Sequence, residues 1–275
     1  MPGIFKIASV PYLNARPLVF GLDHEPRVRL RQELPCGLGP LLRSGEADVA
    51  LLPAIEYVRL AAATGERARN GPARVVALPV AAIGSRGTVG SVRLFGYTEP
   101  ERIRRVLLDP ASRTSNALAR LMVIRRLGLR PHFVLPEEAA ASPARPPDAE
   151  LVMGDRGLVA ERPQARWVQD MGQEWERLTH LPFIYAFWVA RADAPLGLLT
   201  EVLAAARDAG LAAREEIAGG APAALGIPAD VARRHLFEQI HYAFGPKEQE
   251  GLRAFYRMAG EEGLAPDGVR LRLAR

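Results

Sequence analysis

Short apolar runs bounded by turn residues alternate with segments of helical periodicity through the first third of the chain. Compact runs rich in β-branched residues predict strands, whereas apolar residues that recur every three or four positions predict helices. This alternation is typical of a mainly parallel sheet with helices on both of its faces. The expected strands are residues 5–10, 28–34, 47–53 and 74–80, and the expected helices are residues 38–45 and 53–66.

A second set of such elements begins after residue 97 and predicts a second lobe. It consists of a helix over residues 115–128 and of strands at residues 105–109, 132–136, 150–154 and 166–170. Apolar residues at helical spacing then fill the last third of the chain, with predicted helices at residues 198–218, 229–244 and 247–263.

Two stretches, residues 87–97 and the aromatic-rich run 181–191, lie where the chain would cross between the two lobes. If both cross, the last third of the chain returns to the first lobe. We therefore predict an α/β protein with one discontinuous lobe, residues 1–91 plus 189–275, and a second lobe, residues 92–188.

The composition of the chain excludes several classes of protein. The 275 residues are 48% hydrophobic and 24% charged, as in an ordinary globular protein. The net charge of +5 comes almost entirely from arginines dispersed among acidic residues, so we expect no nucleic-acid partner. Cys36 is the only cysteine, which excludes an intramolecular disulfide. The apolar runs are too short for a signal-peptide core or a membrane span, so we expect a cytoplasmic protein. We expect it to be a monomer or a homodimer.

The first candidate for chemistry is SVPYLNARPL, residues 9–18, directly after the first predicted strand. Its two prolines restrict the backbone and produce a stiff polar loop. Ligands of open α/β sheets bind outside the carboxyl ends of strands, so Tyr12, Asn14 and Arg16 are candidate binding residues. The alternative is that Asn14 caps a helix over residues 15–22 and that Arg16 is simply solvated.

The second candidate is the hydroxyl-rich start of the helix near residue 115. Backbone N–H groups at such a start attract an anion, and each charge-assisted hydrogen bond contributes about 1.5–3 kcal/mol. Ordinary capping by one hydroxyl is the alternative, but it leaves the other polar side chains without a role. The candidate carboxylate or phosphate ligands here are Arg113, Thr114, Ser115 and Asn116.

Two further stretches carry weaker signals. Ser85 and Ser91 lie among glycines within residues 80–95, which favours close approach to a ligand, a hinge or a plain hairpin. Gly154 and Asp155 follow a predicted strand, and Asp155 either contacts a ligand hydroxyl or caps a helix.

The histidine-rich segment HLFEQIH does not predict a metal site. His235, Glu238 and His241 are spaced by three residues, whereas helical zinc motifs place two histidines four residues apart. The chain also lacks dinucleotide-binding, Walker, nucleophile-elbow and EF-hand motifs, so we expect neither a cofactor nor a metal.

Five segments resemble, in order and spacing, the chorismate dehydratase family of the futalosine route to menaquinone. They span about two thirds of the chain and are residues 9–18, 45–57, 112–121, 151–158 and 170–191. The resemblance implies a type II periplasmic-binding-protein fold, with two lobes joined by two crossing strands and the substrate in the cleft. It also implies a cytoplasmic carbon–oxygen lyase that converts chorismate to 3-(1-carboxyvinyloxy)benzoate and water without cofactor or metal.

The family likeness implies roles for several residues. Chorismate carries two carboxylates, which Thr114 with Ser115 and Ser85 with nearby amides would bind, while Asn14 would contact the substrate near the reacting carbons. The neutral Asn14 amide cannot accept the proton. Our hypothesis is that the enolpyruvyl carboxylate of the substrate is the base, and Glu56 and Asp155 are the protein alternatives.

Two other functions stay open at this point. A sister lyase, which processes a cyclised futalosine, has the same fold but uses a second-lobe histidine, whereas His132 and His180 lie outside the site motifs here. A non-catalytic solute-binding protein for small carboxylates is the other alternative, and such receptors normally carry an export signal.

Overall fold

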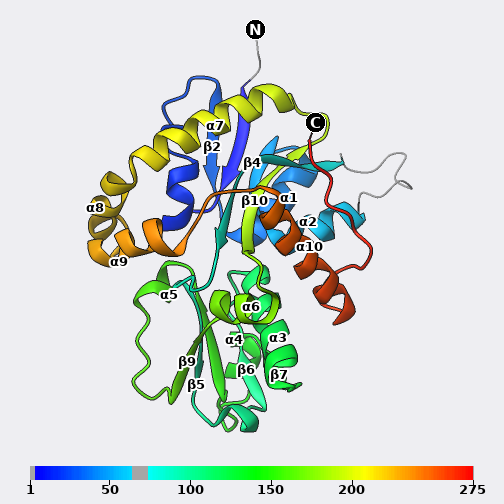
Figure 1. Ribbon diagram of the computed structural model, residues 1–275, viewed down its shortest axis with the longest axis vertical. Coiled ribbons are helices and arrows are strands. Elements are labelled where there is room, and N and C mark those ends of the chain that lie inside the picture. The colour runs from blue at the N-terminus through cyan, green and yellow to red at the C-terminus, as the bar shows by residue number, and fades with distance from the viewer. Residues whose placement is uncertain (1–3, 64–73, 275) are drawn as a thin grey trace.

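The computed structural model describes residues 4–63 and 74–274. In this part of the chain two lobes lie one above the other, each built around a five-stranded sheet (Figure 1). The expected two-lobed α/β architecture is confirmed. The three residues 64–66 of the helix predicted at 53–66 lie outside the described residues.

The first sheet has the strand order β2-β1-β3-β10-β4. Its strands are β1 (Phe5–Ser9), β2 (Val28–Gln32), β3 (Val49–Pro53), β4 (Val75–Ser85) and β10 (Phe183–Arg191). A 3-10 helix, η1 (Leu13–Leu18), follows β1, and a π-helical turn, η3 (His235–Gln239), follows α9. The α-helices of this lobe are α1 (Pro35–Ser44), α2 (Ala54–Ala63), α7 (Leu196–Ala212), α8 (Arg214–Leu225), α9 (Ala229–Arg234) and α10 (Pro246–Glu261).

The second sheet has the strand order β7-β6-β8-β5-β9. Its strands are β5 (Val92–Gly96), β6 (Arg105–Leu107), β7 (His132–Val134), β8 (Ala149–Met153) and β9 (Trp167–Asp170). Its helices are η2 (Pro100–Arg102), α3 (Arg113–Leu127), α4 (Pro136–Ala140), α5 (Asp155–Val159) and α6 (Met171–Thr179). Within the described ranges, none of the helices is long and apolar enough to cross a bilayer.

Both sheets are mainly parallel, as expected, but each contains one strand that runs in the opposite direction. β1 pairs in parallel with β2 and β3, but β10 is antiparallel to β3 and β4. In the second sheet β5 is likewise antiparallel to β8 and β9. β5 and β10 are the strands that follow the two crossings, so each enters its sheet from the cleft and runs away from it, whereas β1, β3 and β8 end at the cleft.

The predicted crossings lie at residues 86–91, between β4 and β5, and between α6 and β10. β10 pairs with β4 from Phe183 onward, so the predicted return to the first lobe at residue 189 falls inside a strand of the first sheet. The exact lobe boundaries stay a prediction. The last third of the chain, yellow to red in Figure 1, covers the first lobe as expected.

An aromatic cluster fixes the second crossing. Phe183, the first residue of β10, packs edge-on against Trp175 of α6 and Phe255 of α10, with ring centroids 5.2 and 4.9 Å away. All three side chains are almost fully buried. Such pairs contribute about 0.5–1.5 kcal/mol each beyond the burial of their surface. This crossing is therefore held by packing between the lobes.

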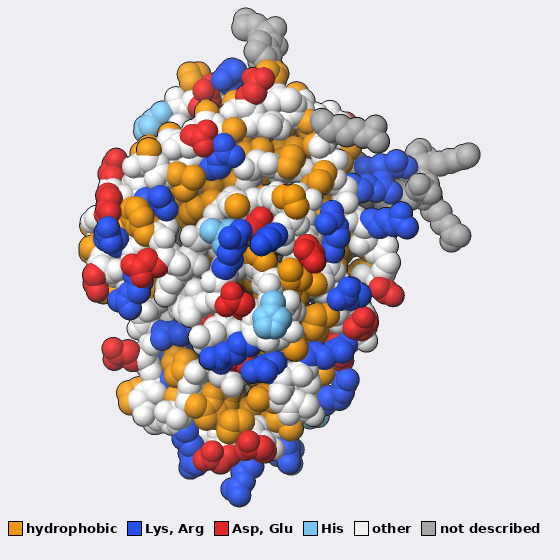
Figure 2. All heavy atoms as spheres, viewed as in Figure 1, with side chains coloured by type: hydrophobic (Ala, Val, Ile, Leu, Met, Phe, Trp, Pro, Cys, Tyr) orange, Lys and Arg blue, Asp and Glu red, His pale blue; other side chains and the backbone are white. Residues whose placement is uncertain are grey.

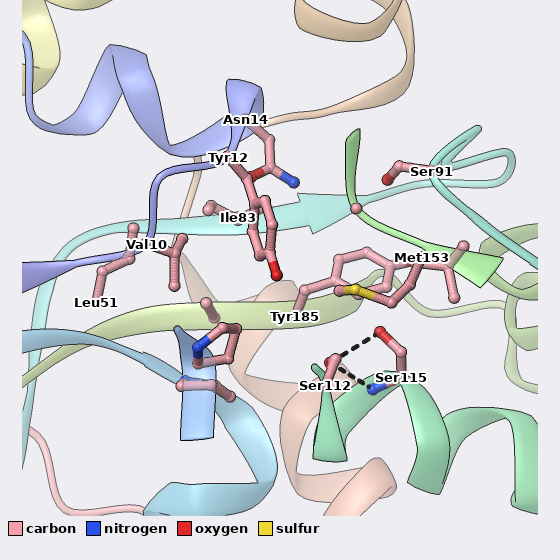
Figure 3. Close-up of a pocket in the computed structure, with 15 residues that line it drawn as sticks. Val10, Tyr12, Asn14, Leu51, Ile83, Ser91, Ser112, Ser115, Met153 and Tyr185 are labelled. Atoms are coloured by element: carbon pink, nitrogen blue, oxygen red, sulfur yellow. Dashed lines mark hydrogen bonds between the residues drawn. The ribbon is translucent and has the colours of Figure 1, made fainter. Parts of the chain in front are cut away.

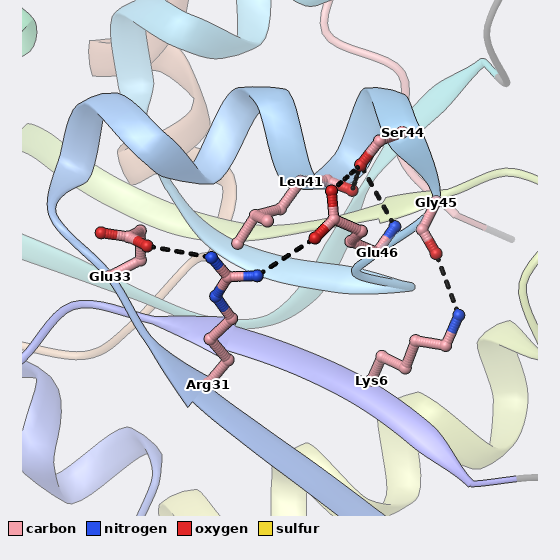
Figure 4. A network of polar contacts seen from close by, with 7 residues as sticks. All are labelled: Lys6, Arg31, Glu33, Leu41, Ser44, Gly45 and Glu46. Atoms are coloured by element: carbon pink, nitrogen blue, oxygen red, sulfur yellow. Dashed lines mark hydrogen bonds and ion pairs between the residues drawn. The ribbon is translucent and has the colours of Figure 1, made fainter.

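A surface polar network anchors α1, whose first residue will line the site (Figure 4). Arg31 of β2 lies 3.2 Å from both Glu33 and Glu46, and Lys6 of β1 donates to the Gly45 carbonyl at 3.0 Å. These contacts join β1 and β2 to the residues on either side of α1. Because exposed ion pairs contribute little to stability, they add little to the free energy of folding. Elsewhere on the surface, basic and acidic side chains are interspersed on the face shown in Figure 2.

Candidate active site

A pocket lies between the two lobes, where strand ends of both sheets face each other (Figure 3). The space that the centre of a water molecule can reach is about 50 Å³. A single water needs about 10–15 Å³ on this measure, so the lobes are nearly closed and a larger ligand requires them to part. The pocket is lined by Val10, Tyr12, Asn14, Pro35, Leu51, Pro53, Ile83, Ser91, Val92, Ser112, Ser115, Met153, Gly154, Tyr185 and Ala186.

The lining is apolar with a few neutral polar groups. Among the described residues that line it, none carries a formal charge. The polar groups are one side-chain amide and five hydroxyls, from Asn14, Tyr12, Tyr185, Ser91, Ser112 and Ser115. The pocket therefore suits a ligand with an apolar ring and with polar groups that neutral hydrogen-bond donors can satisfy.

Asn14 points its side chain into the pocket (Figure 3). The alternative that Asn14 caps a helix is wrong, because η1 already begins at Leu13 and Asn14 lies inside it. The Tyr242 hydroxyl donates to the Asn14 backbone carbonyl at 3.0 Å and holds this turn in place. The side-chain amide makes no hydrogen bond to any residue that the structure describes, so it is available to a ligand.

Tyr12 presents its phenol to the same pocket. Burial raises the pKa of Tyr12 to about 12, and the carboxylates of Asp109 and Asp155 add to the increase, whereas Arg156 opposes it. The phenol is therefore protonated at neutral pH. It serves as a hydrogen-bond donor and not as a base.

Tyr185 lines the pocket, whereas Ser85, which was predicted to contact the substrate, does not. Its hydroxyl lies 3.1 Å from Ser85 Oγ, and Tyr185 lines the pocket while Ser85 is buried behind it. Burial raises the pKa of Tyr185 well above its ordinary value, so this phenol also stays protonated. Tyr185 is not one of the predicted site residues. It lies within residues 181–191, for which the sequence predicts only a crossing between the lobes. The available signal was one phenol within an otherwise apolar run.

The start of α3 combines capping with access to the pocket. Ser112 Oγ accepts the Ser115 N–H at 3.2 Å and lies 3.1 Å from Ser115 Oγ, and both side chains line the pocket. Ser112 was not among the predicted ligands. The N–H groups of Arg113 and Thr114, the first two of the helix, make no hydrogen bond to any described residue. This helix start therefore offers hydroxyls and free amides together.

The side chains of Arg113 and Thr114 face the first lobe instead of the pocket. Thr114 Oγ1 accepts the Ile55 N–H at 3.1 Å, and Arg113 Nη1 lies 3.2 Å from both carboxylate oxygens of Glu56. Glu56 also pairs with Arg59 at 3.3 Å. The Glu56 carboxylate is thus occupied by two guanidinium groups and does not line the pocket.

Asp155 likewise reaches across the cleft. Its carboxylate oxygens accept the Leu13 N–H at 3.0 and 3.3 Å, while the preceding Gly154 lines the pocket. Burial raises the pKa of Asp155, and the Leu13 N–H and the positive charge of Arg16 oppose this increase. Arg16 itself does not line the pocket.

Comparison with known proteins places the chain in a family. A family model described as menaquinone biosynthesis matches residues 5–261. The chain belongs to this family. A chorismate dehydratase from Thermus thermophilus is 29% identical over 266 residues, which cover 90% of this chain and 93% of the relative.

Solved structures show the fold that this family member shares. A protein from Archaeoglobus fulgidus matches with a TM-score of 0.68 and 16% identity, over 94% of this chain and 97% of the other. The alkanesulfonate-binding protein from Xanthomonas axonopodis pv. citri, bound to MOPS, matches with a TM-score of 0.68 and 15% identity, over 98% and 96% of the two chains. The expected periplasmic-binding-protein-like fold is thus confirmed.

The structure separates the residues predicted for the site of this family member into two groups. Tyr12, Asn14, Ser91, Ser115 and Gly154 line the pocket. The others lie outside the lining, several of them in contacts between the lobes, and they are Arg16, Glu56, Ser85, Arg113, Thr114, Asn116 and Asp155. Asn116 only closes its own loop, because its amide accepts the Asp109 N–H at 3.2 Å and donates to the Asp109 carbonyl at 2.8 Å. The roles of all of them in binding stay predictions.

Proposed function

We propose that this protein is a chorismate dehydratase, a carbon–oxygen lyase that converts chorismate to 3-(1-carboxyvinyloxy)benzoate and water. The observation that carries the proposal is the neutral pocket between the lobes, in which the free Asn14 amide faces the hydroxyls at the start of α3. The full-length similarity to the Thermus thermophilus chorismate dehydratase supports it.

The donors in the pocket match the two carboxylates of chorismate. The hydroxyls of Ser112 and Ser115 line the pocket, and the free N–H groups of Arg113 and Thr114 lie between them in the chain, so in our proposal this helix start binds one carboxylate. Ser91 and the Tyr185 phenol supply a second set of donors. In our proposal Ser91 and Tyr185 bind the carboxylate that was predicted to contact Ser85. The Ser85 hydroxyl forms a hydrogen bond with the Tyr185 hydroxyl instead.

The absence of charge suits a substrate that provides its own base. Loss of water requires a proton to leave C3 and a hydroxide to leave C4, and the C3–H electron pair then completes the aromatic ring. The enolpyruvyl carboxylate takes up the C3 proton and passes it to the hydroxide that leaves C4, so that water is released and the carboxylate is again ionised. An arginine beside that carboxylate would lower its pKa by about 1–3 units and weaken it as a base. Neutral donors hold it without that loss of basicity.

The protein alternatives for the base are less well placed. The Glu56 carboxylate is engaged by Arg113 and Arg59, and the Asp155 carboxylate accepts the Leu13 N–H. Neither side chain lines the pocket. In our proposal Asn14 orients the substrate, and Tyr12 donates a hydrogen bond.

Asn14→Ala tests this proposal. Loss of one positioned donor lowers turnover by about 100-fold or more, so the variant is expected to be nearly inactive while its circular dichroism and melting temperature stay those of the wild type. Turnover is followed as loss of the chorismate diene absorbance and chromatographic appearance of the aromatic product. Full activity in the variant would refute the assignment.

Two other outcomes replace parts of the proposal. If Glu56→Gln or Asp155→Asn abolishes turnover while chorismate still binds, a protein carboxylate is the base. If the wild type binds chorismate without turnover, the protein is a small-carboxylate binding protein.

A further inference from the structure

Two helix starts of the first lobe are capped by side chains of the second lobe. Asp155 accepts the N–H of Leu13, the first residue of η1, and Thr114 Oγ1 accepts the N–H of Ile55, the second residue of α2. The first N–H groups of a helix have no partner inside it. Tyr12, which precedes η1, supplies no side-chain cap of its own. Each lobe-to-lobe contact therefore satisfies a backbone donor that the first lobe leaves unpaired.

Each of the two caps lies next to residues that line the pocket. Leu13 lies between the lining residues Tyr12 and Asn14, and Asp155 follows the lining residue Gly154. At the other cap, Thr114 precedes the lining residue Ser115. Forming the two contacts thus brings the polar groups of both lobes into one pocket.

An ion pair accompanies the Thr114 cap. Arg113 of α3 meets Glu56 of α2, whose side chain is only 8% exposed. Separation of the lobes would return the Leu13 and Ile55 N–H groups to water, together with the buried side chains of Thr114 and Glu56 and the half-buried Asp155 carboxylate. Because water satisfies these groups nearly as well, the contacts bias closure without preventing opening.

We propose that Asp155 and Thr114 are positioning residues, which hold the lobes closed over the substrate by capping η1 and α2, and that neither exchanges a proton with the substrate. The turnover readout of this inference rests on the proposed function, whereas lobe closure is measured independently of it. When only part of the free protein is closed, apparent affinity falls in proportion to that part. Loss of a cap therefore raises KM more than it lowers kcat.

Closure is measured as the distance between two nitroxide labels by double electron–electron resonance. The labels are placed at Leu198 of α7 and Val168 of β9, exposed positions on different lobes, after Cys36→Ser removes the native thiol. Asp155→Ala and Thr114→Val delete the acceptors, whereas Asp155→Asn and Thr114→Ser keep one. Asp208→Ala, which removes an exposed carboxylate that pairs with Arg207 alone among the described residues, is the control for lost charge.

We expect Asp155→Ala and Thr114→Val to shift the label distances to longer values in the free protein. Each raises the KM for chorismate by about tenfold, the effect of losing one hydrogen bond in the closed state, while kcat changes by less than about threefold. Asp155→Asn and Thr114→Ser restore both readouts most of the way, and Asp208→Ala leaves them unchanged.

Two results would overturn the inference. One is an unchanged distance distribution in both acceptor-deleting variants. The other is an Asp155→Asn variant with wild-type distances and KM but no turnover, which would make Asp155 a proton-transfer residue. If the wild type fails to convert chorismate while the deletions still lengthen the distances, closure by these caps is supported and the proposed function is wrong.

Discussion

Gly154 is the position beside the pocket where one added methyl group should strain the backbone. Its dihedral angles are φ 68° and ψ −152°, a region that is essentially restricted to glycine. A Cβ atom at this position would also lie 3.4 Å from Cε1 of Tyr12. Gly154→Ala therefore forces a strained backbone directly before α5, while its methyl group finds room beside the Tyr12 ring.

The strained backbone at residue 154 determines how much stability Gly154→Ala should lose. Placing a non-glycine residue in this region costs about 1–3 kcal/mol, and we expect the free energy of unfolding to fall by that amount. For a protein of this size, each kcal/mol corresponds to a melting-temperature change of about 2 °C. The added Cβ would only make van der Waals contact with the Tyr12 ring, so KM for chorismate should change little.

Gly219→Ala provides a matched control. Gly219 lies within α8, where an added Cβ would have no heavy atom within 4 Å. Alanine is more favourable than glycine inside a helix by about 0.5–1 kcal/mol, so this variant should be more stable than the wild type. Urea unfolding and thermal melts measure both. Equal stability of Gly154→Ala and the wild type would refute the strain assigned to residue 154.

Two further predictions concern His235 and Tyr185. His235 is almost fully buried, and burial lowers its pKa to about 4. Because the unfolded chain takes up this proton from about pH 6.5 downward, the free energy of unfolding should fall by about 3 kcal/mol between pH 6.5 and 4, and His235→Phe should show a smaller fall in pH-dependent urea melts. Tyr185→Phe should lower stability by about 0.5–1.5 kcal/mol and raise KM for chorismate. Tyr97→Phe, which removes a hydroxyl bonded to Glu150 outside the pocket, should lower stability without changing KM, and equal KM values in the two variants would contradict the role given to Tyr185.

The periodic pattern predicted the elements well because most of them bury apolar residues locally. Residues 49–53 of β3 are buried throughout, as expected for a strand covered on both faces. The pattern failed at η1, where a local cap by Asn14 was the alternative. The acceptor for the Leu13 N–H is Asp155, 142 residues away in the chain, and no local motif reveals such a partner.

The candidate site shows the same limit at the level of single side chains. The stretch from residue 112 to residue 116 was correctly selected as a place where polar groups gather, but successive helical residues point about 100° apart. Ser112 and Ser115, three residues apart, face the pocket, whereas Thr114 faces α2. Which of these hydroxyls meets a ligand therefore depends on how the two lobes are oriented.

The distribution of charge around the cleft follows from the same orientation. Two arginines of the site motifs lie outside the pocket and are neutralised by carboxylates, Arg113 by Glu56 and Arg156 by Asp109 at 2.7 Å. The residues that line the pocket are neutral, so the substrate carboxylate that we propose as the base would keep its affinity for a proton. Moving a cation into the pocket, for example with Ser91→Arg, would strengthen anion binding and weaken this base at the same time.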